Sequence, residues 1–478
     1  MLMIEVPAYA KELDCRFRVL RVAPDRQRCL LEALLPAGFA VLPARLAAID
    51  GLLADGEVYA SVRELWRERD AKLGTSALTE GRPTIPIETF VRMMVLKTRT
   101  GWGYQRLVRE VADSLHLRRF CEIGLADRMP DESTLRKMCH RLGRERVEAI
   151  TLKVIELSGA ETGFRPRAAR ADSTVIEANI RYPTDAGLAY DGVVLLAREA
   201  RRLRSIVGPG APRVCDRGRG AKGRLRRLGR SLKRRTGEAK QDVLQITGEC
   251  GDLLGKTVRE AHRLIAHLQA GSERQQAAAT ALAEHVERCE RICEQIRKRL
   301  AGERISDRLV SLHDPDARPI CKGKLAKKTE FGYVQQICEI TENTTGARGY
   351  ILPPTTAPGN PGENELLPGT LASLDTLGFA IRELTLDGGF GKHATQDAID
   401  ASSQDPKTVY VAGSQEPDSP RTRRRLYRYR AGAEGRISHL KRDYGLRRSR
   451  LPGHTGQQTW CCWSILAYNL DTHAHRLN

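Results

Sequence analysis

The chain has 478 residues, a formal net charge of +20 and a sequence pI near 9.6. Its length allows roughly two to four domains and a substantial core. The positive charge is spread along the whole chain, which favours nucleic acid over a membrane surface as its polyanionic partner. Aromatic residues make up only 5%, so stacking of single-stranded bases is disfavoured and contacts to backbone phosphates fit better.

The N-terminal residues and the cysteines indicate the cellular compartment in which the protein is expected. Glu5 and Lys11 follow Met1 closely, so we expect no signal peptide. The most apolar stretch, about 30–54, is interrupted by charged residues, and we expect no membrane-spanning segment. The 12 cysteines have no framework spacing. They predict free thiols in a reducing cytoplasm.

Residues 1–80 carry no pattern to which a role can be assigned. Residues 81–160 instead contain three segments with helical periodicity, namely ETFVRMMVLKTRT, YQRLVREVADSL and TLRKMCHRLG. The third begins after Pro130-Asp131 and is expected to end at Gly143. Such a run suits a helix-turn-helix-like DNA-binding domain, although an ordinary helical subdomain fits the pattern equally well.

The segment ARADSTVIEANIRYPTDAGL contains the first candidate site residue. Residues 168–180 favour a β-strand that carries Asp172, and Thr184 and Asp185 are suited to cap the helix that follows. Taken alone, Asp172 fits a turn or a cap as well as a site. Glu177 is an accessory candidate, although such a residue more often orients its neighbours through hydrogen bonds.

Residues 187–305 have the character of an insertion. Their first part is a dense Arg/Lys run with a Gly-rich loop. It predicts a surface that follows phosphates and is partly disordered until DNA binds. A merely solvated charged face is the alternative, weakened by the scarcity of acidic residues in the run.

Two heptad stripes follow, over 254–268 and 282–300, separated by Gly271-Ser272. They predict an antiparallel helical hairpin, with a dimerising coiled coil as the second choice. His285, Cys289 and Cys293 stand at i, i+4 and i+8, as zinc ligands could. The cysteines occupy the apolar seam and a fourth ligand is not apparent, so core packing is favoured over zinc.

Beyond residue 306 the apolar period changes to two. EFGYVQQICEI and ARGYILPP predict antiparallel strands joined by a turn. Asp314 and Asp316 lie in an Asp-Pro-Asp turn and are expected to be structural. Further on, IRELTLDGGFGK predicts a strand that ends at Asp387, where ligands of open α/β sheets bind. The glycines after Asp387 would let a substrate backbone approach closely.

The stretch 421–450 is strongly basic and has Glu434 near its middle. Tyr427, Arg430, Glu434 and Lys441 stand at i, i+3, i+7 and i+14, so they project from one side of a helix. A polar stripe at core spacing predicts phosphate contacts and, through Glu434, a metal ion. A solvated basic helix with one compensating glutamate is the alternative. TWCCWSILAYNL then predicts an apolar helix that closes the domain.

The pattern Tyr-x2-Arg-x3-Glu-x6-Lys resembles the signature of a large superfamily of bacterial insertion-sequence DDE transposases at all four positions. The order of features in 82–143 resembles the amino-terminal domain of these proteins. Asp172, followed by Ser-Thr, Asn-Ile and Tyr-Pro-Thr-Asp, resembles the surroundings of their first catalytic aspartate, above all in an ISNCY-like branch. The resemblance covers 82–186 and 306–470, and the insertion 187–305 is the main departure from it.

The resemblance implies an α/β, RNase H-like catalytic core: a mixed five-stranded sheet flanked by helices. The core would be divided by the insertion into residues 161–186 and 306–478. Asp172, Asp387 and Glu434 would be its catalytic carboxylates. They would hold two Mg²⁺ (or Mn²⁺) ions about 3.5–4 Å apart, with oxygen ligands alone.

Six residues are expected to bind DNA phosphates: Tyr427, Arg430, Lys441, Arg424, Arg425 and Arg436. The resemblance further implies a cytoplasmic, nucleoid-associated transposase that binds the terminal inverted repeats of its element. It would cleave the double-stranded ends, join them to target DNA, and act as a homodimer or a higher assembly. A metal-dependent nuclease of the same fold and a non-catalytic architectural DNA-binding protein are the alternatives.

Overall fold

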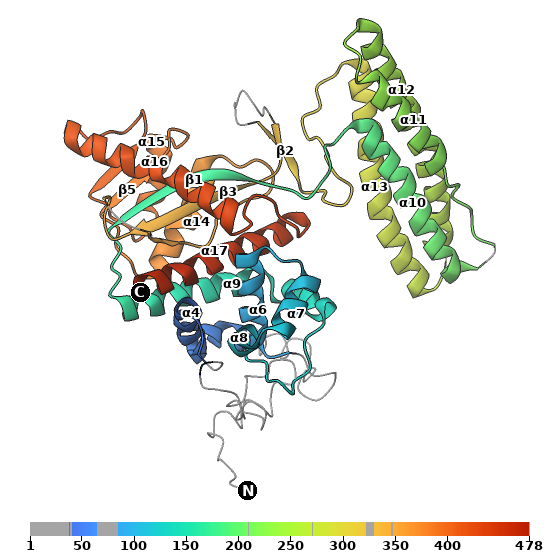
Figure 1. The fold of residues 1–478 in the computed structure, drawn as a ribbon. Helices are drawn as coiled ribbons and strands as arrows, with labels where there is room; N and C mark the ends of the chain where they lie inside the picture. The colour runs from blue at the N-terminus through green and yellow to red at the C-terminus, as the bar shows by residue number, and fades with distance from the viewer. Residues whose placement is uncertain are drawn as a thin grey trace. The chain divides into compact units, whose positions relative to one another are not determined.

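The computed structural model describes residues 38, 41–64, 85–208, 210–269, 271–321, 329–345 and 348–477. It divides into two compact units (Figure 1). Unit 1 combines Met1–Glu177 with Val334–Asn478, and unit 2 is Ala178–Tyr333. Much of 1–80, the region without an assigned role, lies outside the described residues. Unit 2 begins before and ends after the predicted insertion 187–305.

The first half of unit 1 is helical. Its elements are α4 (Ala44–Ala54), η1 (Gly56–Tyr59), α6 (Ile87–Thr100), α7 (Tyr104–Asp113), α8 (Leu115–Phe120) and α9 (Glu132–Thr162). Asp131 caps α9 by accepting a hydrogen bond from the Thr134 backbone N–H. Gly143 breaks the helical geometry, with φ 69° and ψ −176°. The expected end at Gly143 is confirmed, and a second helical segment follows it directly as far as Thr162, with buried residues such as Val147 and Ile150.

The last helix, α17 (Gly453–Leu477), closes the helical core as predicted. It packs along α9 and against α4 and α6, and Figure 1 shows α17 and α9 running side by side. Trp463 meets the Phe90 ring edge-on, with centroids 5.7 Å apart. Cys461 and Cys462 are buried free thiols. The vicinal cysteines and Trp463 therefore belong to the core.

The sheet contains β1 (Ala168–Glu177), β2 (Arg318–Cys321), β3 (Thr329–Thr341), β4 (Tyr350–Ile351), β5 (Glu383–Leu386) and β6 (Thr408–Val411). Among the described residues its order is β2-β3-β1-β5-β6, with β4 also on β3. The predicted hairpin is confirmed, because β3 and β4 pair antiparallel. The prediction of five strands is wrong by one. The added strand, β2, is four residues long and contains Pro319, so it has little strand signal of its own.

The two faces of the sheet are chemically different. On one face, Ala169, Ala171, Leu384 and Leu386 pack into an apolar cluster with α14 (Glu363–Thr376) and α15 (Lys392–Asp400). Side chains alternate along a strand. The intervening residues of β1 and β5 therefore face the other side, which α16 (Pro420–Asp443) covers.

The described residues of unit 2 form the helices α10 (Asp185–Val207), α11 (Gly218–Ser231), α12 (Gly237–Gln269) and α13 (Glu273–Ala301). The helical hairpin is confirmed, since α12 and α13 pack together across a short link. Thr184 accepts from the Gly187 backbone N–H at the start of α10, as expected of a cap. The expectation of partial disorder in the basic run is wrong for 218–231. There, Ala221 and Leu228 are buried on one side of α11.

Candidate active site

Asp172 and Asp387 are brought together by the pairing of β1 with β5. The two strands are parallel, and Ala171 pairs with Leu386 in the last matched position. The residue that follows on the first strand is Asp172, and the residue that follows on the second is Asp387. Neighbouring strands lie about 4.8 Å apart, so the two aspartates are neighbours on the face that α16 covers.

The two aspartates differ in their surroundings. Asp172 is 9% exposed, and its Oδ1 accepts a hydrogen bond of 2.7 Å from the Ser173 backbone N–H. Asp387 lies just beyond the end of its strand, and its side chain is 41% exposed. A substrate would therefore reach this pair from the open side, where Asp387 lies.

Helix α16 supplies the third carboxylate. Ser419 caps the helix through the Thr422 backbone N–H, and Pro420 occupies the first turn, where it needs no amide hydrogen. Five side chains of the helix are buried against the sheet and α17: Leu426, Tyr429, Ala433, Ile437 and Leu440. Each residue of the predicted polar stripe directly follows one of these buried residues in the sequence. The stripe of Tyr427, Arg430, Glu434 and Lys441 therefore runs along the edge of the buried face.

Arg430 connects two of the three candidate carboxylates. Its Nη1 lies 2.7 Å from Asp387 Oδ1, and its Nη2 lies 3.7 Å from Glu434 Oε1. The arginine side chain is 11% exposed, whereas that of Glu434 is 68% exposed. Asp387 and Glu434 thus share one guanidinium, and this cation offsets the repulsion between them.

The glycines after Asp387 have a packing role that the sequence did not reveal. A Cβ on Gly389 would lie 2.0 Å from Oε2 of Glu363, the first residue of α14. The Gly391 backbone N–H donates to Asn364 Oδ1 over 3.1 Å. The loop that follows Asp387 is therefore held against the start of α14, and Glu363 is a further carboxylate beside it.

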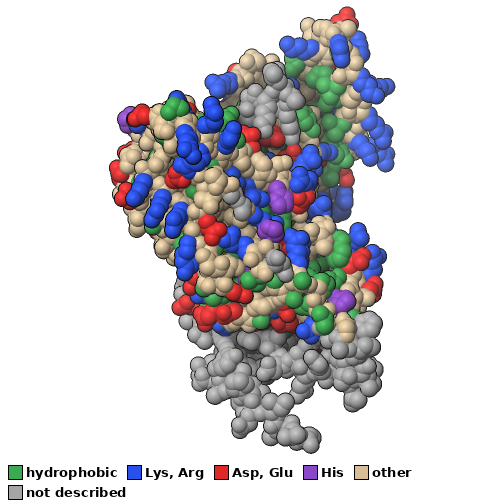
Figure 2. All heavy atoms as spheres, turned by 60° about the vertical axis from the view of Figure 1, so that its left-hand side comes forward, with side chains coloured by type: hydrophobic (Ala, Val, Ile, Leu, Met, Phe, Trp, Pro, Cys, Tyr) green, Lys and Arg blue, Asp and Glu red, His purple; other side chains and the backbone are tan. Residues whose placement is uncertain are grey.

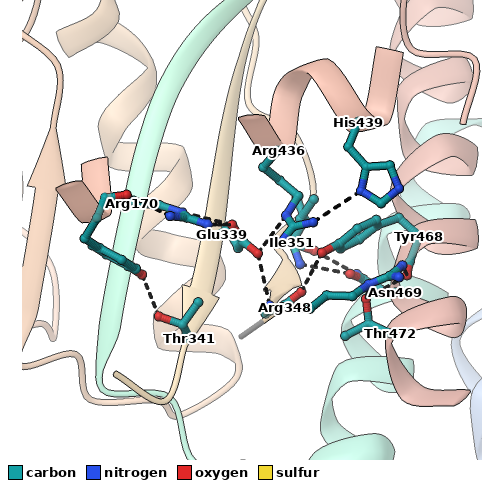
Figure 3. A network of polar contacts seen from close by, with 12 residues as sticks. Arg170, Glu339, Thr341, Arg348, Ile351, Arg436, His439, Tyr468, Asn469 and Thr472 are labelled. Carbon is teal, nitrogen blue, oxygen red and sulfur yellow. Dashed lines mark hydrogen bonds and ion pairs between the residues drawn. The ribbon is translucent and has the colours of Figure 1, made fainter. Parts of the chain in front are cut away.

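A buried ion-pair network fixes α16 on the sheet (Figure 3). Glu339 on β3 is 2% exposed and binds Arg170 of β1 at 2.5 Å and Arg436 of α16 at 2.9 Å. Arg170 also donates to the Tyr429 carbonyl oxygen over 2.7 Å. A buried carboxylate between two arginines costs several kcal/mol to break on one side. Neither Glu339 nor Arg170 stands in a pattern that predicts this pairing, because the partners lie far apart in the chain.

The remaining predicted phosphate-binding residues occupy different sides of α16. Tyr427 is 54% exposed, and the Arg430 guanidinium lies 5.8 Å from its ring centroid. Arg424 is exposed on the outer side. Among the described residues it makes no ion pair. Lys441 lies near Cys461 of α17, two turns beyond Glu434. These three residues extend the polar side of the helix in both directions from the carboxylates.

Arg425 and Arg436 are placed differently. Arg425 pairs with Glu383 of β5, and Arg436 pairs with Glu339. Arg425 is five residues from Arg430, or about 140° around the helix. Both arginines therefore flank the buried face on the side opposite the carboxylates. They anchor α16 to the sheet.

The other acidic residues considered from the sequence are Asp314, Asp316 and Glu177, and the contacts of Asp314 and Glu177 are with other parts of the fold. Asp314 is 4% exposed and accepts a hydrogen bond from the Tyr333 hydroxyl. Asp316 is exposed in the turn that precedes β2. Glu177 binds Arg448 at 2.8 Å, while its backbone bridges to the same segment. It holds residues 447–449 against the end of β1.

The predicted metal site can be tested on its donor set. No group of three or more His, Cys, Asp and Glu side chains within the described ranges lies close enough to hold a metal ion; this applies to Asp172, Asp387 and Glu434 as well as to His285, Cys289 and Cys293. Carboxylates at two strand ends and one helix nevertheless supply the oxygen ligands that Mg²⁺ and Mn²⁺ prefer. Arg430, between Asp387 and Glu434, indicates that a positive charge is stabilised there.

Two family models match the chain. A transposase domain of the DUF772 type matches residues 45–141, and a transposase DDE domain matches residues 308–470. No curated protein and no solved structure matches significantly. The first match starts well before residue 81, so part of the region without an assigned role belongs to this domain. Asp387 and Glu434 lie inside the second match, whereas Asp172 lies in neither.

Both matches define the chain as a transposase, and its mixed α/β fold is consistent with this class. It belongs to the DDE transposases of insertion sequences. No helix in the described part of the chain is long and apolar enough to cross a membrane.

Proposed function

We propose that this chain binds the terminal inverted repeats of its insertion sequence, cuts the DNA strands there and joins them to a target. The catalytic residues would be Asp172, Asp387 and Glu434 on an RNase H-like core. The observation that carries the proposal is the juxtaposition of the two aspartates on paired parallel strands, with α16 above them. It links Asp172 to the matched domain, although the insertion separates them in the sequence.

A divalent metal pair bound by the three carboxylates would activate the attacking oxygen and stabilise the leaving oxygen of an in-line phosphoryl transfer. Asp172 would be the rigid ligand, because it is nearly buried and its carboxylate is held by the Ser173 amide. Asp387 and Glu434 would be the adjustable ligands, since both are more exposed. Arg430 would then exchange its carboxylate partners for a DNA phosphate.

The exposed side of α16 is the proposed phosphate-binding surface beside the carboxylates. Tyr427, Arg424 and Lys441 extend it along the helix, and Arg430 lies at its centre. Arg425 and Arg436 act indirectly in this scheme, because they position α16 through Glu383 and Glu339. As the resemblance implies, the protein would act as a homodimer or a higher assembly on two DNA ends.

A metal-dependent nuclease without strand joining is the second candidate, because the same carboxylates serve hydrolysis and strand transfer alike. An architectural role without chemistry would leave no reason for Arg430 to neutralise two acids, one at a strand end and one on the helix that covers it. The two catalytic candidates differ in their products. Only a transposase joins a 3′ end to a new DNA molecule.

The deciding experiment uses labelled duplexes that carry the DNA flanking the gene, with Mg²⁺ and an unlabelled target plasmid. We expect cuts at the element ends and joined products with the wild type, and neither with Asp172→Asn or Glu434→Gln. Asp397→Asn is the matched control, because this exposed carboxylate belongs to α15, which packs on the other face of the sheet from α16. Cleavage that survives Asp172→Asn would refute the site assignment. Cuts without joined products would favour the nuclease.

A further inference from the structure

Helix α11 of unit 2 sorts its basic residues onto two sides. Three arginines form ion pairs with α12: Arg217, at the N-cap of α11, pairs with Glu260, and Arg224 and Arg227 pair with Glu249, all at 2.5–3.1 Å. On the outer side are four exposed cations, which we call the α11 stripe: Arg219, Lys222, Arg226 and Arg230. Among the described residues the stripe makes no ion pair.

The geometry of the α11 stripe is regular. Its members stand at i, i+3, i+7 and i+11, so they fall within about 80° of arc and extend over about 16 Å of helix. The buried residues Ala221 and Leu228 face the other side of the helix. Figure 2 shows Lys and Arg side chains over the surface of the unit that contains α10–α13.

This helix is not optimised for its own stability. Like charges three and four residues apart destabilise a helix by about 0.2–0.5 kcal/mol per pair. Gly223 and Gly229 flank the stripe, and a glycine inside a helix costs about 1 kcal/mol relative to alanine. A Cβ at either glycine would meet no atom within 4 Å, so packing does not require these glycines. They instead leave the backbone open to a close ligand.

We propose that the α11 stripe binds the phosphate backbone of duplex DNA. This inference rests on the proposed function only in taking DNA as the partner. Over the length of the stripe a duplex presents about ten phosphate charges. A membrane surface fits less well, since a membrane-bound helix needs an apolar side toward the lipid. The apolar residues of α11 face the bundle instead. Neither family match includes α11, so the surface is specific to this insertion.

The test compares two full-length variants that lose the same charge. The first replaces the four stripe residues with glutamine. The control replaces four other exposed cations of unit 2 with glutamine: Lys256, Arg263, Arg274 and Arg304. Binding to a random-sequence duplex is measured by fluorescence anisotropy between 50 and 300 mM salt. Both variants should melt at the wild-type temperature or slightly above it, because all the replaced side chains are exposed.

We expect the salt slope of log affinity to fall by up to about 3.6 for the stripe variant, at about 0.9 for each of four phosphate contacts. For the control variant, the salt slope should fall by about one or less. An equal loss in both variants would mean that only net charge matters, and an unchanged slope would refute the proposal. If the stripe variant binds DNA normally but no longer binds phosphatidylserine vesicles, the partner of the α11 stripe is a lipid surface and the DNA proposal is refuted.

The outcome is separable from that of the catalytic proposal, because the duplex carries no element end and no metal is added. A smaller slope in the stripe variant, together with a wild type that never cuts, would support the stripe and refute the enzyme. If the wild type cleaves element ends normally and the salt slope of the stripe variant is unchanged, the enzyme is supported and the stripe proposal is refuted.

Discussion

At the scale of single residues, Arg430 is the cation that contacts two of the three candidate carboxylates. It lies between Asp387 and Glu434 and is itself mostly buried. In the proposed mechanism, a metal ion and this guanidinium would compete for the same two carboxylates. The arginine can therefore keep the acids compatible with each other until metal and DNA arrive together.

We predict that Arg430→Gln binds Mn²⁺ more tightly than the wild type. A partly exposed ion pair contributes up to about 1 kcal/mol, so its loss should raise the metal affinity up to about fivefold. Cleavage should fall at saturating metal, because the phosphate contact is lost. Titration followed by the Mn²⁺ electron paramagnetic resonance signal checks the affinity. Arg428→Gln should leave it unchanged, and weaker Mn²⁺ binding by Arg430→Gln would contradict the competition.

At the scale of elements, the position of α16 depends on one close approach to the sheet. A Cβ on Gly432 would lie 2.0 Å from Nη1 of Arg170. That guanidinium cannot easily move, since Glu339 and the Tyr429 carbonyl oxygen hold it. Gly435, one turn later, has no atom within 4 Å of such a Cβ. The two glycines form a matched pair.

We predict opposite effects of alanine at these two positions. Gly432→Ala should reduce the free energy of unfolding by about 1–3 kcal/mol, as overpacking does, and should reduce cleavage by displacing Glu434. Gly435→Ala should raise stability by up to about 1 kcal/mol through helix propensity. Urea unfolding measures both changes. If Gly435→Ala is stable but cleaves poorly, the space beside Gly435 is needed by DNA. Equal stability of the two variants would contradict the packing argument.

The contact between α17 and α9 should depend on pH through His473. This side chain is fully buried, and its Nδ1 lies 2.8 Å from the Ser158 hydroxyl. Burial lowers the pKa of His473 below its ordinary value of 6.5, and Glu161 opposes this only in part. The folded state therefore favours the neutral imidazole. Stability from this group is complete above pH 6.5 and is lost as the pH falls below that value, because the unfolded chain then binds the proton more readily.

We predict that the wild type loses up to about 1.4 kcal/mol of unfolding free energy per pH unit below 6.5 relative to His473→Gln. Glutamine has no proton to take up in this range. Taking the difference between the two proteins removes the contribution of the other titrating groups. Denaturant unfolding between pH 5 and 8 gives the comparison. Parallel curves for the two proteins would contradict the assignment.

Local patterns in the sequence predicted the elements better than the contacts between them. The cap at Asp131, the hairpin of β3 and β4, and the helix of Glu434 follow from periodicity and turn residues within a short window. The partners of Arg425 and Arg436 could not be predicted in this way, since Glu383 and Glu339 are far away in the sequence. The role of Gly389 beside Glu363 was hidden for the same reason. Strand β2 was missed because four residues with a proline give too weak a pattern.

At the scale of the whole molecule, catalysis and much of the electrostatic binding are assigned to different units. The carboxylates belong to unit 1, and the α11 stripe belongs to unit 2. Each compact unit has its own hydrophobic clusters, so substitutions in one should leave the fold of the other intact. The insertion would then add DNA affinity to a catalytic core whose chain it interrupts between its first and second aspartates.

We predict that cutting and salt-dependent binding can be lost separately. Asp172→Asn should abolish cleavage while binding DNA as tightly as the wild type or more tightly, because a negative charge near the phosphates is removed. The stripe variant should lose affinity at about 150 mM salt, with cleavage falling in proportion to the DNA bound. Binding free energies of the combined variant should equal the sum of the single effects, since distant sites usually act additively. A clear departure from that sum would mean that one DNA segment contacts both the carboxylates and the α11 stripe.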